Sequence, residues 1–87
     1  MARVTLLLFA AAREAAGTNR DTVDAGTVGE VLAIARTRYG DDFVSVLAAS
    51  RVWLDGEEPA AGDATPVTDD AEVAVLPPVS GGAAGAG

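Results

Sequence analysis

The sequence predicts a two-layer α+β domain in which one long amphipathic helix packs across a mixed β-sheet. Eleven valines dominate the bulky apolar residues, which favours strands over a bundle of helices. The two most apolar strand-like segments, 4–9 and 72–76, lie near opposite ends of the chain, with a well-capped helix between them. Since 87 residues can form one small core, we expect these two strands to be central neighbours that pair in parallel.

The first part of the chain predicts a buried strand, a short helix and an edge strand. Segment 4–9 is apolar apart from Thr5, so both of its faces are apolar, as in a central strand. Segment 10–16 is rich in alanine and predicts one or two helical turns that end at Gly17. Segment 20–24 is polar around a single valine and predicts an edge strand.

The long helix has the clearest local signal. Thr27 and Glu30 form a capping box, in which the threonine caps the helix and the glutamate reaches back to it. The helix then runs to Tyr39 with two arginines in its last turn, where cations suit the helix dipole, and Gly40 ends it. Its apolar face is expected to contain Val28, Val31, Leu32, Ala35 and Tyr39.

The second half predicts a further short helix and two strands. Asp41-Asp42 can cap a helix through Leu47, and segment 51–54 is a short strand whose Trp53 we expect in the core. Asp55-Gly56 favours a tight hairpin turn. The polar stretch that follows is expected to be loop, and the last strand, 72–76, ends where two prolines remove the ladder donors.

The missing residue types exclude several kinds of chemistry. The chain has no cysteine, histidine or lysine, so disulfides, thiolate metal sites, side-chain thioesters and Schiff bases are impossible. Its carboxylate clusters lack the spacing of a calcium loop, and its serines have no partner base. We therefore expect no metal site and no bound cofactor.

The charge balance limits the partners. Six arginines oppose 13 carboxylates, which gives a net charge of −7, so we expect no binding to nucleic acid or to anionic membranes. Basic protein surfaces are the expected partners. No apolar run approaches the ~20 residues of a membrane span, and the N-terminal segment has no convincing cleavage site, so a cytoplasmic location is expected.

The C-terminal tail is the most unusual segment. Pro77-Pro78 and Val79-Ser80 lead to Gly81-Gly82, and only glycine and alanine occupy 83–87. We divide the chain into a domain, 1–80, and a flexible tail, 81–87. By composition the tail can be a linker, or an arm that enters a narrow site, because glycine lets another backbone approach closely.

Three segments make the chain resemble the ubiquitin-like sulfur carriers, above all the small subunit of molybdopterin synthase (MoaD) and, more distantly, the thiamine carrier ThiS. Phe-Ala-Ala-Ala-Arg-Glu-Ala-Ala-Gly at 9–17 is similar to the family's stretch after its first strand, and Thr-Val-Gly-Glu-Val-Leu at 27–32 to its helix start. The specific match is 70–82, with its strand, double proline and Gly-Gly. The resemblance implies a β-grasp, ubiquitin-like fold. Two departures are Asp-Ala-Glu at 70–72 for the usual Gly-Asp-Glu, and the residues that follow Gly82.

The resemblance also implies a mechanism. An E1-like enzyme (MoeB/ThiF-like) uses ATP to adenylate the carboxylate of Gly82, next to Gly81, and a sulfur donor turns it into a thiocarboxylate. The tail then enters a larger MoaE-like subunit, where the sulfur passes to a pterin precursor in molybdenum cofactor biosynthesis. The chain would be the carrier subunit of a heteromeric sulfurtransferase and not catalytic alone. Because Gly82 is followed by Ala83, we expect trimming to free its carboxylate; the alternative is that Gly87 is itself the reacting terminus.

By the same resemblance, the partner-binding residues are Phe9, Arg13, Leu76, Pro77, Pro78 and Val79. Other functions stay open. The chain can serve as a sulfur carrier for cysteine or thiamine, as a ubiquitin-like conjugation tag on target lysines, or as a domain of a fused synthase whose residues 83–87 begin a linker.

Overall fold

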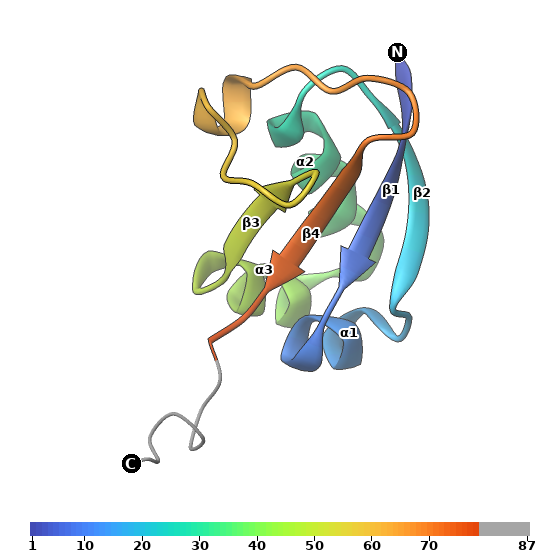
Figure 1. Cartoon of the computed structure of the whole chain (residues 1–87). Coiled ribbons are helices and arrows are strands. Elements are labelled where there is room, and N and C mark those ends of the chain that lie inside the picture. The colour runs from blue at the N-terminus through green and yellow to red at the C-terminus, as the bar shows by residue number, and fades with distance from the viewer. Residues whose placement is uncertain (79–87) are drawn as a thin grey trace.

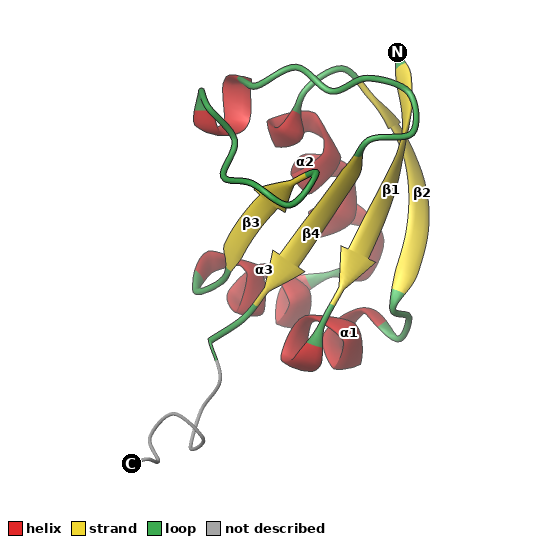
Figure 2. Cartoon of the chain, viewed as in Figure 1, coloured by secondary structure: helices red, strands yellow, loops and turns green. Residues whose placement is uncertain are grey.

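The computed structural model describes residues 1–78 and contains a four-stranded mixed sheet (Figures 1 and 2). Its order is β2-β1-β4-β3; β1 and β4 pair in parallel at the centre, and both edge strands pair antiparallel. The predicted parallel central pair is therefore confirmed. The strands are β1 (Ala2–Leu8), β2 (Arg20–Ala25), β3 (Arg51–Leu54) and β4 (Glu72–Leu76).

Among the described residues, three α-helices, and not one long helix alone, lie on one side of the sheet and leave its other face uncovered (Figure 1). They are α1 (Ala10–Ala16), α2 (Val28–Tyr39) and α3 (Asp41–Ala48), with a short 3₁₀ helix, η1 (Gly62–Ala64). Thr27 caps α2 as predicted, since its Oγ1 accepts from the Glu30 N–H at 3.2 Å. The Glu30 carboxylate, however, accepts from the N–H of Gly26 at 2.6 Å and not from that of Thr27.

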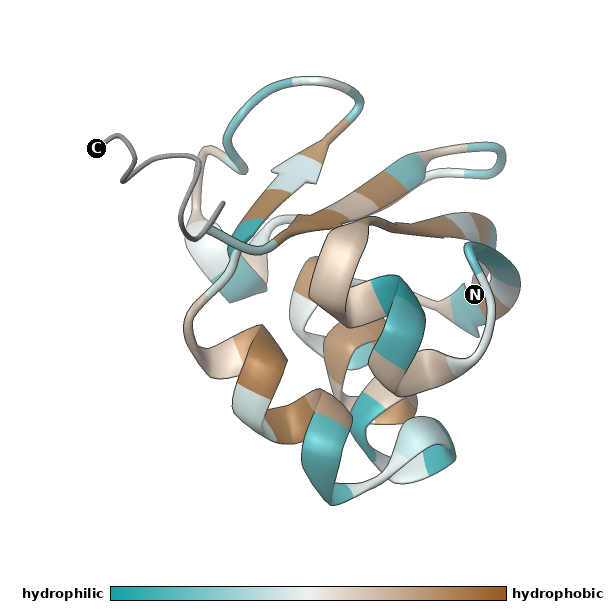
Figure 3. Cartoon of the chain, turned by 90° about the horizontal axis from the view of Figure 1, so that it is seen from below, coloured by the Kyte–Doolittle hydropathy of each residue, from teal (hydrophilic) through white to brown (hydrophobic). Residues whose placement is uncertain are grey.

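The core lies between the sheet and the helices, where every second residue of the strands points. Val4, Leu6 and Leu8 of β1 are at most 1% exposed, as are Val73 and Val75 of β4. Hydrophobic residues occur both in the strands and on the helices, whereas the turns are mostly hydrophilic (Figure 3). The inner face of this sheet therefore provides much of the core, and Phe43 of α3 is fully buried with it.

Side chains satisfy the free backbone groups of Arg20 and Thr22 in β2, which is an edge strand. Thr18 Oγ1 donates to the carbonyl of Arg20 at 3.0 Å and accepts from its N–H at 3.4 Å. Asp21 Oδ1 accepts from the Thr22 N–H at 2.8 Å, and an Arg38 N–H donates to the Thr22 carbonyl at 3.2 Å. These contacts protect an edge that could otherwise pair with another chain.

Asp55-Gly56 forms the predicted tight turn after β3. Both residues have positive φ (52° and 85°), and Leu54 and Glu57 exchange two backbone hydrogen bonds across the turn. The chain then follows a longer loop through η1 to β4, across the end of the sheet opposite to α1 (Figure 1). Within residues 1–78, no helix has both the length and the apolar character needed to cross a membrane.

Candidate functional site

The open face of the sheet has an apolar patch, which we define as Leu7, Phe9, Trp53, Ala74 and Leu76. Leu7 of β1 pairs with Ala74 of β4, and Ala74 pairs with Trp53 of β3, so these three side chains form one row across the sheet. Phe9 and Leu76 extend the patch toward the end of β4, and the hollow that the five residues line also touches Gly56 and Glu72.

Phe9 is the most exposed member of the patch for a clear structural reason. It follows β1 and precedes α1 as the N-cap residue, and its side chain is 45% exposed. Its N–H donates to the Val75 carbonyl at 3.3 Å, which fixes its backbone beside β4. An aromatic side chain on a fixed backbone is suited to contact a partner, because little conformational freedom is lost on binding.

Arg13 lies one helical turn after Phe9, and its N–H approaches the Phe9 carbonyl at 3.4 Å. Its side chain is exposed and forms no ion pair with the residues 1–78. Figure 1 shows α1 at the end of the sheet where β4 ends and the chain leaves the domain. The structure thus brings Phe9, Arg13 and Leu76 to the same end of the molecule.

The chain leaves β4 through Pro77 and Pro78. Leu76 and Pro77 are half-buried and Pro78 is exposed. Neither proline can donate to a neighbouring strand, so the sheet ends there. The other predicted site residues, Val79, Gly81 and Gly82, lie outside the described residues.

Trp53 was expected in the core, and this prediction is wrong. The indole is half-buried on the open face, whereas its neighbours Val52 and Leu54 pack against the core. Successive side chains of a strand point to opposite faces, so the residue between two core-facing neighbours must point outward. This alternation can be read from the sequence, and it would have predicted that Trp53 lies on the open face with the other patch residues.

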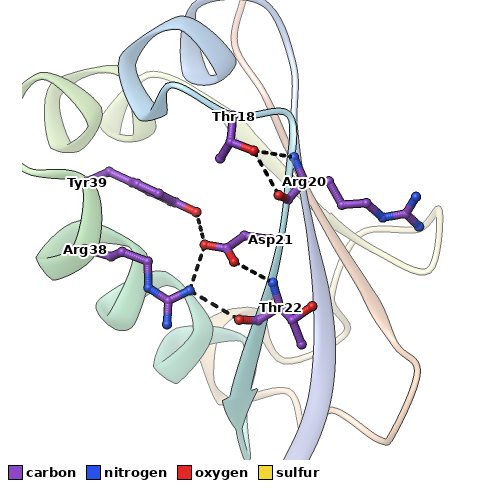
Figure 4. Close-up of polar contacts among 6 residues, drawn as sticks. All are labelled: Thr18, Arg20, Asp21, Thr22, Arg38 and Tyr39. Carbon is purple, nitrogen blue, oxygen red and sulfur yellow. Dashed lines mark hydrogen bonds and ion pairs between the residues drawn. The ribbon is translucent and has the colours of Figure 1, made fainter.

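A polar cluster lies on the helix side of the sheet and joins β2 to α2 (Figure 4). Asp21 accepts hydrogen bonds from the Tyr39 hydroxyl and from Arg38, the latter at 2.7 Å. The bond from Tyr39 and the neighbouring Arg38 lower the pKa of Asp21, against the opposing effect of burial. Burial and the hydrogen bond to Asp21 raise the pKa of Tyr39 to about 12, and Asp21 also raises the pKa of Arg38.

Asp21 is therefore ionised and Tyr39 protonated at neutral pH, and their hydrogen bond, with that of Arg38, links β2 to α2. Within residues 1–78, no group of acidic side chains is arranged to hold a metal ion. The candidate site is therefore taken from what the described residues do show, the apolar patch on the open face of the sheet.

The strand order, with a parallel central pair and α2 across one face, defines a β-grasp, ubiquitin-like fold. The family model of the ThiS family matches residues 6–82, and the chain belongs to this family. It is a ThiS/MoaD-type sulfur carrier or a ubiquitin-like modifier.

Solved structures agree with the fold. Small archaeal modifier protein 1 from Methanosarcina acetivorans is 29% identical, with a TM-score of 0.83 over 93% of this chain and 97% of that one. Its counterpart from Haloferax volcanii is 30% identical (TM-score 0.73; 91% and 98% covered). Subunit 1 in a complex with subunit 2 of molybdopterin-converting factor from Helicobacter pylori is 20% identical (TM-score 0.70; 91% and 97% covered). The comparison with curated proteins gave no match.

Proposed function

We propose that this chain is the sulfur-carrier small subunit of a molybdopterin synthase, with the sulfur held as a thiocarboxylate on Gly82. One observation carries the proposal: an exposed apolar patch lies at the end of the domain from which the chain continues toward Gly81-Gly82. A partner that binds the patch is therefore close to the segment that leads to Gly81-Gly82. Such placement favours the reaction, since small errors in position cost large factors in rate.

The chemistry requires nothing from the side chains of the carrier. An E1-like enzyme (MoeB/ThiF-like) would join the Gly82 carboxylate to the AMP part of ATP and release pyrophosphate. A sulfur donor would then displace AMP and leave a thiocarboxylate. This fits a chain that lacks cysteine and histidine, because the reacting group is the main-chain carboxyl. Since Ala83 follows Gly82, that carboxyl must first be released by trimming.

A larger MoaE-like subunit is the proposed acceptor of the tail. Subunit 1 of the H. pylori molybdopterin-converting factor, which shares this fold, forms a complex with subunit 2. In the proposed complex, Phe9, Trp53 and Leu76 contact the partner, with Arg13 and the two prolines beside them.

A second candidate function, a protein modifier joined to target lysines, is favoured by the 29–30% identity to small archaeal modifier proteins. Both functions share adenylation of the terminal glycine and separate afterwards. Sulfur carriers for cysteine or thiamine share the thiocarboxylate as well. The receiving partner decides among them.

The experiment compares the 87-residue chain with a chain that ends at Gly82. Each is incubated with ATP, an E1-like enzyme and a sulfur donor, and intact mass is measured. We expect the shorter chain to gain the mass of sulfur replacing oxygen, and the longer chain to stay unchanged. Transfer of that sulfur to a pterin precursor with a MoaE-like subunit supports the synthase, whereas lysine-linked adducts in cells support the modifier. If no competent E1-like enzyme activates the shorter chain, both proposed functions, synthase subunit and protein modifier, are wrong.

The docking role of the patch has its own test. Phe9→Ala and Trp53→Ala should each weaken binding to the MoaE-like subunit by tenfold or more, because buried aromatic anchors can contribute ~2 kcal/mol or more. Val44→Ala is a matched control, since Val44 is also exposed (36%) but lies on α3. Equal binding by all three variants would exclude the patch as the interface.

A further inference from the structure

The charges of this chain are separated along the sheet, which its net charge of −7 conceals. Seven of the 13 carboxylates lie between β3 and β4 or at the start of β4, in segment 55–72, which contains no arginine. This segment crosses the end of the sheet where β4 begins (Figure 1). The opposite end, where β4 ends at Leu76, is called the exit end below.

Three exposed arginines lie at the exit end. Arg20 of β2 pairs with Leu7, and Arg51 of β3 pairs with Leu76, so each shares the open face with a patch residue. Figure 4 shows the Arg20 side chain on the opposite side of β2 from Asp21, which confirms that it points away from the helices. Arg13 follows Phe9 on α1. Arginines therefore flank the apolar patch on both edges of the sheet and beyond the end of β1.

Three carboxylates must be set against these cations. Glu14 follows Arg13 on α1 and is exposed, but it forms no ion pair with Arg13. Glu72 lines the patch, but at the other end of β4. Glu58 contacts Arg51 at 3.5 Å, and both side chains are about 70% exposed (74% and 69%). An ion pair this exposed is weak and exchanges readily. The guanidinium groups of Arg13 and Arg20 have no carboxylate partner within residues 1–78.

We infer that the exit end binds a partner surface with carboxylates around an apolar centre, and that this partner is the E1-like activating enzyme. The inference rests on the proposed function, because that enzyme must hold the chain next to Gly82 in either pathway. Partners with basic surfaces, which the net charge predicts, would meet repulsion here. Charges around an apolar contact also fix the orientation in which the partner binds. Here Glu72, at the start of β4, should face a cation of the partner.

The test uses the chain that ends at Gly82 and measures pyrophosphate release by the E1-like enzyme. Arg20→Glu and Arg51→Glu should raise the KM for the carrier tenfold or more and leave kcat within twofold. Arg36→Glu is the matched control: it changes net charge equally, from an exposed position on α2, and should change KM less than twofold. Added salt should raise the KM for the unmodified chain more than the KM for Arg20→Glu or Arg51→Glu, because salt screens exposed charges.

The outcomes separate the two proposals. If the unmodified chain is activated and all three variants have the same KM as the unmodified chain, the inference is wrong and the proposed function stands. If no chain is activated, the proposed function falls and takes the inference with it. Binding of the unmodified chain to single-stranded DNA or to anionic lipid vesicles, lost in Arg20→Glu while KM is unchanged, would also overturn it, since the arginines would then serve another anion.

Discussion

Asp21 shows how one carboxylate can join two elements that are distant in sequence. It receives hydrogen bonds from Arg38 and Tyr39 at the end of α2 and from the backbone of Thr22. Tyr39 in turn packs edge-to-face against Phe43, with ring centroids 5.2 Å apart. The cluster therefore connects the free edge of the sheet with the core. The spacing of these residues along the chain does not predict this contact.

We predict that Asp21→Asn lowers the free energy of unfolding by about 1 kcal/mol at pH 7, because the amide removes the charge that Arg38 and Tyr39 favour. The pKa of Asp21 is below its ordinary value of 3.8 in the folded state. Its stabilisation is therefore present above that value and is lost as pH falls through the folded pKa. Urea titrations of both proteins from pH 7 to about pH 3 should show the difference shrinking below about pH 4.

Glu14→Gln serves as the control for this prediction, since Glu14 is exposed on α1 and forms no hydrogen bond or ion pair with a described side chain. It should leave stability unchanged within ~0.5 kcal/mol. A stability difference for Asp21→Asn that persists unchanged to pH 3 would show that packing, and not ionisation, is what the substitution alters.

At the scale of elements, α2 approaches η1 unusually closely at Gly29. A Cβ at this position would lie 2.9 Å from the Cβ of Asp63 and 3.1 Å from its carbonyl oxygen. Neither atom is the end of a flexible side chain, so the two elements would have to move apart. Gly29 thus permits the loop between β3 and β4 to pack against the helix.

We predict that Gly29→Ala destabilises the fold by about 1 kcal/mol. Alanine gains about 1 kcal/mol in helix propensity, but the forced separation costs about 1–3 kcal/mol. Thermal unfolding measures the net effect. Adding Asp63→Gly to the variant removes one of the two clashing atoms and should recover part of the loss. A Gly29→Ala protein more stable than the unmodified chain would contradict the close packing of η1 on α2.

The sequence allowed most elements to be predicted, because apolar runs and caps are local signals. The apolar strands β1 and β4 and the threonine-capped α2 are each indicated by the sequence of the segment itself. The pairing of β1 with β4 was predicted because they are the two most apolar strands. The edge contacts of Thr18 and Arg38 were not predictable, because they depend on how strand and helix meet in space. Trp53 was misplaced because large aromatic residues are usually buried, and its strand alternation was given too little weight.

At the scale of the candidate site, the resemblance supplied Phe9, Arg13 and Leu76, and the structure places all three at the exit end. Arg20 and Arg51 were missed. Their relation to the patch depends on the strand order, which places β2 and β3 on opposite edges of the sheet. Net charge adds all residues together, whereas a partner meets one end only. Composition alone therefore does not show that Arg20 and Arg51 flank the patch.

The whole molecule combines an exposed apolar patch with a large negative charge, and the charge should control self-association. At pH 7 the net charge of −7 keeps copies apart. The isoelectric point is about 4.2, and near it this repulsion disappears. We predict that the protein is monomeric at pH 7 and associates through the apolar patch near pH 4.2, as measured by light scattering.

Trp53→Thr tests whether the patch is responsible. An indole contributes roughly 150–250 Å² of contact area, and threonine removes most of it while keeping a residue that favours strands. The variant should associate less near the isoelectric point, and circular dichroism at the same pH should show that both proteins keep their fold. Val44→Ala, which trims an exposed apolar side chain elsewhere, should associate like the unmodified protein. If Trp53→Thr associates just as strongly, the contact between copies forms elsewhere, and the patch is not the surface on which the apolar attraction acts.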